Sequence, residues 1–279
     1  MSKRNSDPGP KRNKTPIPAY QIQINQRSPM VVFSKKVLLV SIFLPVTFLS
    51  AQVDTIDISR DLLVKQLPEG TNRYAVFVGR DDGTMRYVGL WNRAVRNSRL
   101  NGKDCIVIDQ EWWTGDSAGY RKVYSIVAQK DFSPLYHYTR DGKGKVEAYN
   151  FAPERVAGAD TVVGNSKAGF SVPLTTPTLN WELDLEVFQI LPYSSGKTFV
   201  LNFYHPGGPP PGFHSYTVSG EETLALAGGG TAPCWILSVD YGRGGASFWV
   251  SKNTREILKS KDTFPGGYRY KIKLATDAR

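Results

Sequence analysis

The stretch that decides the fold is Tyr268-Arg269-Tyr270-Lys271-Ile272-Lys273-Leu274, near the C-terminal end of the chain. Its apolar and basic residues alternate without interruption, and a period of two residues is typical of a β-strand that is buried on one face. Similar short runs recur along the chain and are rich in β-branched and aromatic residues. They are Arg73–Val78, Met85–Trp91, Cys105–Trp113, Val123–Gln129, Leu135–Tyr138, Val146–Phe151, Thr198–Tyr204, Ser215–Val218, Cys234–Tyr241 and Ser247–Ser251.

Short turn signals separate these runs, among them Asp81-Asp82-Gly83, Asn101-Gly102 and Asp141-Gly142. Such connections are too short for the crossovers that parallel strands need, so the strands are expected to pair antiparallel. Many short strands at this spacing indicate a sandwich or barrel. The sequence therefore predicts an all-β fold with one or two short helices, in the form of an antiparallel β-barrel or half-barrel.

Two segments depart from the strand pattern. Trp181–Leu191 lies between Asn180, a candidate N-cap, and Pro192, and the first turn is acidic, as expected of a helix N-terminus. Strict alternation over Trp181–Val187 fits a strand equally well. A second short helix is expected at about Ser59–Leu67.

The N-terminal part of the chain has the features of an export signal. Lys35-Lys36 precedes the apolar run Val37–Leu49, which ends at Ser50-Ala51-Gln52, as in a secretory signal peptide. The run is shorter than the ~20 apolar residues that span a bilayer, although an uncleaved signal anchor is an alternative. We expect a signal peptide at 30–51, a single β-rich domain at 52–279, and a periplasmic or secreted protein.

Residues 1–29 are polar and rich in Pro, Lys and Arg, so they are expected to be a disordered extension. Because Met30 by itself begins an ordinary signal peptide, a start of translation at Met30 is the alternative. Residues 1–51 hold eight Lys or Arg against Asp7, which accounts for seven of the ten net positive charges of the chain. A nucleic-acid binder carries its basic patch on the folded domain, so no nucleic acid is predicted as a partner. Membrane association is expected to be at most peripheral.

Two parts of the chain resemble each other. Val127–Leu135 and Trp249–Ile257 share an apolar residue, then a Lys followed by Asp or Asn, and each follows a strand that carries a Cys. This pattern predicts two copies of a three-strand meander, although β-hairpins also resemble one another by composition. Cys105 and Cys234 are the only cysteines. They hold matched places in the two copies, and in an oxidising compartment they could form a disulfide or remain as two buried thiols.

Several stretches resemble one known family. These are Tyr216–Glu222, Cys234–Leu237, Phe248–Lys252 and Glu256–Lys259, together with Trp181–Asp184, Leu191–Tyr193, Asn202–Tyr204 and Gly89–Trp91. They are similar to the domain of unknown function 3108 family of secreted bacterial proteins, and the resemblance covers most of Asp57–Leu274. It implies a β-rich, barrel-like envelope protein without an assigned activity. The Trp-x-x-Lys phrase Trp249–Lys252 is also similar to periplasmic lipoprotein carriers, whose open half-barrel holds acyl chains.

Aromatic residues are the candidates for ligand binding. Trp91, Trp235, Trp249 and Tyr87 are predicted at or near an apolar space between the two meanders, although ordinary core packing explains them as well. We therefore expect an exported, non-enzymatic envelope protein that binds a lipid-like or other apolar ligand in a concave sheet. A structural or interaction protein of the envelope is an alternative, with another envelope protein as its partner.

A further alternative is an exported serine hydrolase. Ser117 lies in Gly115-Asp116-Ser117-Ala118-Gly119, which fits the Gly-x-Ser-x-Gly nucleophile elbow. The elbow needs a helix after the turn, whereas the residues that follow read as a strand. His205 and His214 flank a Pro/Gly-rich loop but lack further metal ligands nearby. No catalytic residue, metal or cofactor is therefore predicted.

Overall fold

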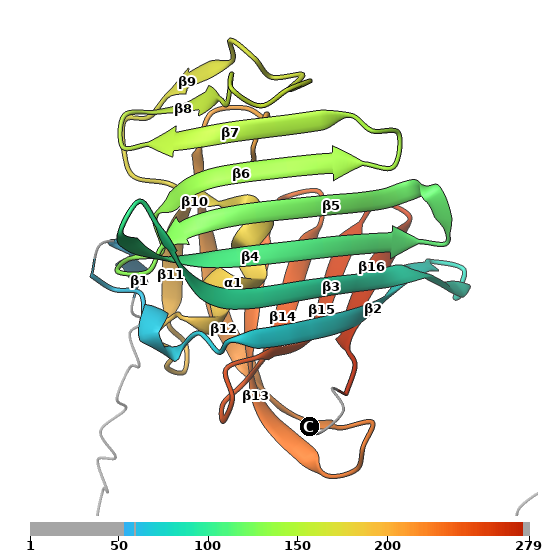
Figure 1. Cartoon of the computed structure of the whole chain (residues 1–279). Coiled ribbons are helices and arrows are strands. Elements are labelled where there is room, and N and C mark those ends of the chain that lie inside the picture. The colour runs from blue at the N-terminus through green and yellow to red at the C-terminus, as the bar shows by residue number, and fades with distance from the viewer. Residues whose placement is uncertain (1–52, 59, 276–279) are drawn as a thin grey trace, which may run out of the picture. The chain divides into compact units, whose positions relative to one another are not determined.

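Alternating strands dominate the computed structural model, which describes residues 53–58 and 60–275, with the side chains of 116–118 left out. The extension, the signal peptide and the start at Met30 therefore lie outside the described residues. Sixteen strands form one sheet (Figure 1). They are β1 Val53–Thr55, β2 Gly70–Arg80, β3 Met85–Leu100, β4 Lys103–Thr114, β5 Asp116–Ala128, β6 Pro134–Asp141, β7 Val146–Ala152, β8 Arg155–Gly158, β9 Ser171–Pro173, β10 Leu179–Asn180, β11 Thr198–Tyr204, β12 Gly212–Ala225, β13 Thr231–Asp240, β14 Gly245–Ser251, β15 Ile257–Phe264 and β16 Gly267–Lys273.

The order of strands across the sheet is β1-β11-β12-β13-β14-β15-β16-β2-β3-β4-β5-β6-β7-β8-β9, with β10 beside β11. All neighbours pair antiparallel except that β1 and β10 run parallel to β11. The sheet stays open, because among the described residues the edge strands β1 and β9 do not pair with each other. The all-β prediction is confirmed and agrees with the half-barrel alternative, whereas the closed barrel is wrong.

A short helix fills the inner face of the sheet. After the 3-10 turn η2 (Trp181–Leu183), α1 (Asp184–Gln189) begins where the side chain of Asn180 accepts a hydrogen bond from the backbone N–H of Glu182 at 3.0 Å. Figure 1 shows α1 within the curve of the sheet, and its Phe188 packs against Phe248 of β14 at 4.6 Å between ring centroids. The helix expected at Trp181–Leu191 is confirmed, and the strand alternative is wrong.

The segment that precedes β2 contains less helix than expected. Over Ser59–Leu67 the described residues form only one 3-10 turn, η1 (Val64–Gln66). The side chain of Val64 is buried in the main core, which also includes Ile56, Ile58 and Leu62. Burial of these apolar side chains, rather than a repeated helical hydrogen-bond pattern, fixes the path of this segment.

The two meanders are visible in the pairing registers. Cys105 pairs with Ala128 between β4 and β5, and Cys234 pairs with Ser251 between β13 and β14. The turns that follow share one hydrogen-bond pattern, and each contains a non-glycine residue at positive φ, Phe132 at 61° and Arg255 at 62°. The turn hydrogen bonds make Ala128 equivalent to Ser251, whereas the sequence similarity aligns Ala128 with Val250. The two alignments therefore differ by one residue. The fold therefore contains two related units, joined where β16 pairs with β2.

Candidate functional site

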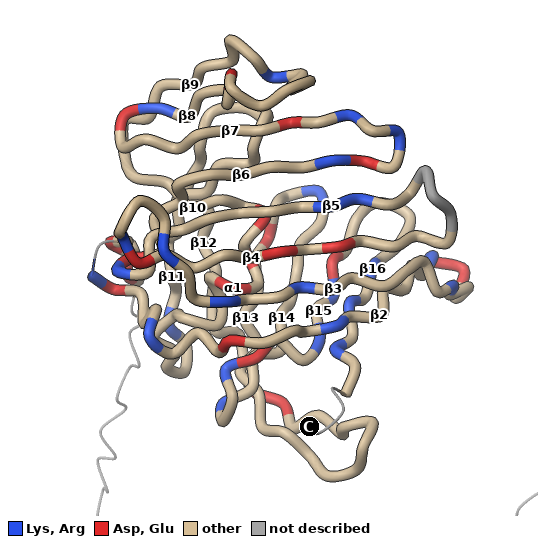
Figure 2. The backbone as a smooth tube through the Cα atoms, viewed as in Figure 1, with Lys and Arg blue, Asp and Glu red and all other residues tan. Residues whose placement is uncertain are grey.

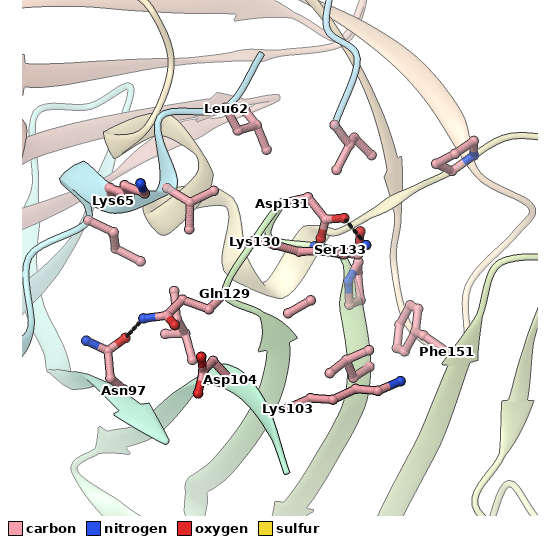
Figure 3. Close-up of a pocket in the computed structure, with 18 of the residues that line it drawn as sticks. Leu62, Lys65, Asn97, Lys103, Asp104, Gln129, Lys130, Asp131, Ser133 and Phe151 are labelled. Atoms are coloured by element: carbon pink, nitrogen blue, oxygen red, sulfur yellow. Dashed lines mark hydrogen bonds and ion pairs between the residues drawn. The ribbon is translucent and has the colours of Figure 1, made fainter. Parts of the chain in front are cut away.

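One end of the sheet holds a cleft of about 1530 Å³. Successive hairpin turns alternate between the two ends of an antiparallel sheet, and this end collects the turns that follow β3, β5 and β7. The segment that carries η1 and the residues before β10 form the remaining walls. Figure 3 shows Leu62, from the segment before η1, and Phe151, from β7, projecting toward the space between them.

One part of the cleft lining is apolar. Its lining side chains come from six parts of the chain and include Leu62, Leu67, Val95, Ile106, Leu135, Phe151 and Leu174. Val95 and Ile106 also belong to the main core, so the cleft opens directly onto the buried interior. Polar and charged side chains make up much of the remaining lining, so the cleft is amphipathic.

Two of the acidic side chains around the cleft form ion pairs. Asp131 lies 3.3 Å from the Lys130 ammonium, and Asp104 lies 2.8 Å from the Arg99 guanidinium. A carboxylate oxygen of Glu69 accepts a hydrogen bond from the backbone N–H of Asn97 at 3.0 Å.

The lysines at the mouth differ from the acids. Lys65 and Lys103 also line the cleft and are exposed, and neither has an ion-pair partner among residues 53–58 and 60–275. Glu69 also lines the cleft and has no cation partner in the described part of the chain, so the two lysines leave a net positive charge of one at this mouth.

The four predicted aromatic residues lie elsewhere. None of Trp91, Trp235, Trp249 and Tyr87 lines the described cleft. Trp91 is buried in the main core and stacks on Trp112 with ring centroids 4.2 Å apart. Trp235 packs at the edge of that core and stacks on Tyr193 at 6.4 Å.

Trp249 and Tyr87 face the opposite side of the sheet. Trp249 belongs to a small outer cluster with Cys234, and its indole N–H donates to Glu222 at 2.7 Å. Tyr87 is exposed, because the pairing of β2 with β3 contains an irregularity at Val76/Phe77 that shifts the alternation. Neither side chain therefore borders the interior of the sheet. The structure thus does not gather the four aromatics around one space.

A buried polar network holds the helical segment against the sheet. The guanidinium of Arg93 donates to Glu186 at 2.8 Å, to Gln110 at 2.8 Å and to the backbone carbonyl of Glu182 at 3.0 Å. Burial disfavours the charge on Arg93, but Glu186 more than offsets this and raises its pKa. Burial likewise opposes the charge of Glu182, yet the guanidinium of Arg121 at 2.9 Å holds the pKa of this carboxyl below its usual value.

His137 is a neutral member of the buried interior. Its Nδ1 lies 2.9 Å from the hydroxyl of Ser125 and 3.1 Å from the amide nitrogen of Asn180, and its Nε2 has no partner among the described residues. Burial lowers the pKa of His137 to about 4.

Ser117 does not lie at a nucleophile elbow. Gly115, at φ 75°, makes a tight turn between β4 and β5, and Ser117 is part of β5, with no helix after it. The hydroxyl that contacts His137 belongs to Ser125, eight residues further along the same strand, which corresponds to about 26 Å.

The other two histidines also have local partners. The ring of His214 packs edge-on against Trp181 at 4.8 Å, and His205 Nδ1 lies 4.0 Å from a carboxylate oxygen of Glu182. Within the described ranges, no group of three or more His, Cys, Asp or Glu side chains could hold a metal ion.

The two cysteines are separate thiols. Cys105 lies in an outer cluster with Val107 and Ile126, whereas Cys234 lies in another outer cluster with Trp249. Both are buried and free, so the disulfide alternative is wrong. Matched positions in two related units place them in different units rather than side by side.

These observations define a class of protein: an open antiparallel β-sheet wrapped around a short helix, with an apolar cleft at one end. The chain belongs to the family described as protein of unknown function (DUF3108), whose model matches residues 73–273. A crystal structure of a beta-barrel-like protein of domain of unknown function DUF1849 from Brucella abortus is similar, with a TM-score of 0.45 and 6% sequence identity. The match covers 76% of this chain and 100% of that chain. No curated protein matches the sequence.

Proposed function

We propose that this chain is an exported, non-enzymatic protein of the cell envelope that binds a lipid-like ligand in the cleft of Figure 3. The observation that carries the proposal is the combination of an apolar part of the cleft lining with two lysines that have no ion-pair partner among the described residues. This combination matches an amphiphile that has an apolar chain and an anionic head group. The cleft replaces the aromatic residues as the candidate site.

The size of the cleft supports a ligand with a long apolar part. Its volume of about 1530 Å³ exceeds the range of roughly 300–1,000 Å³ that is usual for drug-sized ligands. Burial of each methylene group stabilises a complex by about 0.8 kcal/mol. An acyl chain along Leu62, Val95 and Phe151 would therefore supply most of the binding free energy.

The lysines at the mouth favour an anionic head group. Lys65 and Lys103 are contributed by η1 and by the start of β4, so they lie on different elements at the mouth. Each exposed charge pair is worth about 0.2–1 kcal/mol. We therefore expect the head group to set preference among amphiphiles and the apolar wall to set affinity.

A binding assay with an environment-sensitive fluorescent fatty acid tests the site. Ala152 lines the cleft at the end of β7, and Ala152→Trp places an indole in the space that the chain would occupy. Probe affinity is expected to fall at least tenfold. The matched control is Ala225→Trp at an exposed position of β12 that does not line this cleft. Equal affinity of the two variants and the parent would contradict the proposal.

The head group is tested by charge removal. Lys65→Gln combined with Lys103→Gln is expected to weaken binding of a fatty acid several-fold and to leave binding of the corresponding fatty alcohol unchanged. Lys143→Gln, in the turn between β6 and β7, is the control for loss of positive charge elsewhere. A parallel loss for acid and alcohol would refute the electrostatic part of the proposal.

Export is tested separately by sequencing the N-terminus of the protein that the cell releases. The signal peptide expected at 30–51 places the new N-terminus near Gln52. None of the described helices is long and apolar enough to cross a membrane. Recovery of a chain that begins before Leu38 would contradict export by this route.

A further inference from the structure

The outer face of four neighbouring strands carries an unusual set of side chains. The strands β15, β16, β2 and β3 are adjacent in the sheet, and their registers define three rows of cross-strand neighbours. We call these twelve residues the outer patch. Its rows are Thr263, Tyr268, Gly79 and Met85; Lys261, Tyr270, Phe77 and Tyr87; and Lys259, Ile272, Ala75 and Leu90.

The outer patch points away from the core. Tyr74, Val76 and Trp91, which alternate with patch residues along β2 and β3, are buried in the main core. Side chains of a strand alternate between its two faces, so the neighbours of these three residues face outward. Met85 is 55% exposed, Tyr87 57% and Ile272 38%.

The aromatic rings of the patch lie across the surface of the sheet. A Cβ added at Gly79 would lie 2.2 Å from Cζ of Tyr268, so the ring of Tyr268 covers the backbone of the neighbouring strand. Tyr268 contacts Tyr270 with ring centroids 5.3 Å apart, and Phe77 contacts Tyr87 at 5.8 Å. Exposed apolar side chains gathered on one face mark an interaction site, and Met85, Tyr87 and Ile272 are the exposed large apolar members of the patch.

The charge of the patch has one sign. Lys259 and Lys261 are its only charged members, and no position of the three rows is acidic. The ammonium of Lys259 lies 4.1 Å from the ring centroid of Trp249, and that of Lys261 lies 5.1 Å from that of Tyr268. In the part of the chain that the structure describes, neither lysine forms an ion pair.

Neighbouring strands show that this charge pattern is local. The outer positions of β4 that pair with β3 include Asp109 and Glu111. Along β16 (Figure 2), basic residues alternate with the patch residues and face the inner side, where Arg269 and Lys271 pair with Asp262. The positive charge of the outer patch therefore comes from Lys259 and Lys261 of β15, next to the exposed apolar residues of β16, β2 and β3.

We propose that the outer patch docks the protein on the surface of a membrane that contains anionic phospholipid. Tyr and Trp rings with lysines beside them are the composition found where proteins meet the head groups of a bilayer. Exposed Met85 and Ile272 enter the boundary of the acyl region, and Lys259 and Lys261 contact lipid phosphates. The patch lies on the outer face and shares no residue with the cleft. Membrane docking can therefore be tested separately from ligand binding.

Vesicle flotation tests the charge requirement. The protein, in the form that the cell releases, is mixed with vesicles of phosphatidylcholine alone or of phosphatidylcholine with phosphatidylglycerol. Binding is expected only with the anionic vesicles. Each lysine near an anionic surface contributes about fivefold in partitioning, so Lys259→Gln with Lys261→Gln is expected to weaken binding about 25-fold.

The matched control removes the same charge from another part of the surface. Lys122→Gln, on β5 opposite Glu111, with Lys143→Gln is expected to leave vesicle binding within about twofold of the parent protein. Equal effects of the two double variants would overturn the proposal, because net charge rather than the outer patch would then govern binding. Binding to a protein partner by the patch, with no binding to vesicles, would overturn it as well.

A site-specific fluorophore tests the orientation. Both native cysteines are buried, so an environment-sensitive label reacts selectively with the thiol of a Met85→Cys variant. Anionic vesicles are expected to shift its emission to shorter wavelength and to leave the emission of a Lys143→Cys variant unchanged. Equal shifts at both positions, or none at position 85, would overturn docking by this face.

Discussion

The buried pair of Arg93 and Glu186 gives the sharpest test of how the helical segment is held. Their side chains are 3% and 2% exposed. Replacement of Glu186 by Leu leaves a guanidinium without its counter-charge inside the sheet, and such a change costs about 3–5 kcal/mol of unfolding free energy. Single domains are stable by only about 5–15 kcal/mol, so Glu186→Leu is expected to lower the urea midpoint sharply.

The double variant separates burial of charge from loss of packing. In Arg93→Met with Glu186→Leu, Gln110 keeps its bond to the backbone carbonyl of Glu182 at 3.0 Å and its bond from Trp112 at 3.2 Å. No charge is left unpaired at this position, so the double variant is expected to be more stable than either single variant.

Urea unfolding followed by tryptophan fluorescence and circular dichroism measures all four proteins of this cycle. The control is Asp104→Asn, which breaks the exposed pair with Arg99 and is expected to cost less than about 1 kcal/mol. The reasoning would be refuted if Glu186→Leu lowered the free energy of unfolding no more than Asp104→Asn does. It would also be refuted if the loss in the double variant equalled the sum of the losses in the two single variants.

Three further predictions concern single side chains. Burial lowers the pKa of His137 to about 4, against 6.5 in the unfolded chain. Between these pH values the unfolded state binds more protons than the folded state, so the free energy of unfolding decreases as the pH falls. The expected loss is about 2 kcal/mol from pH 7 to pH 5. Urea titrations at both pH values should show this loss in the parent and not in His137→Gln. Ser117→Ala should change stability by no more than about 0.5 kcal/mol, and a fluorophosphonate probe that labels Ser117 would restore the hydrolase hypothesis. Alkylation of the unfolded protein without reductant should modify both Cys105 and Cys234, and a species with neither modified would show a disulfide.

Some structural features could be predicted because they depend only on residues that are close together in the sequence. Alternation over Tyr268–Leu274 is interrupted by nothing, and it corresponds to β16 almost residue for residue. The cap at Asn180 and the stop at Pro192 likewise act over a few residues, so the helix between them could be predicted from local chemistry. Features of this kind depend on neighbours in the chain.

The side of the sheet on which the Trp249 side chain lies cannot be predicted from the neighbouring residues in the sequence. Phe248 and Val250 are buried in the main core on either side of it, so apolar residues occupy both faces of β14 and alternation cannot tell them apart. A register irregularity with β15 adds to the ambiguity, since a shift of one residue moves a side chain to the other face. The cleft was missed for a related reason, because its walls come from turns that are distant in the sequence.

The pairing of β2 with β16 constrains how the fold can form during synthesis. The first long strand and the last one meet in the middle of the sheet, and the two related units are joined through this contact. A ribosome delivers β2 before β3 to β15 and β16 after them, so the centre of the sheet cannot assemble until β16 has been made. Loss of the last strand would therefore divide the sheet between its two units rather than trim one edge.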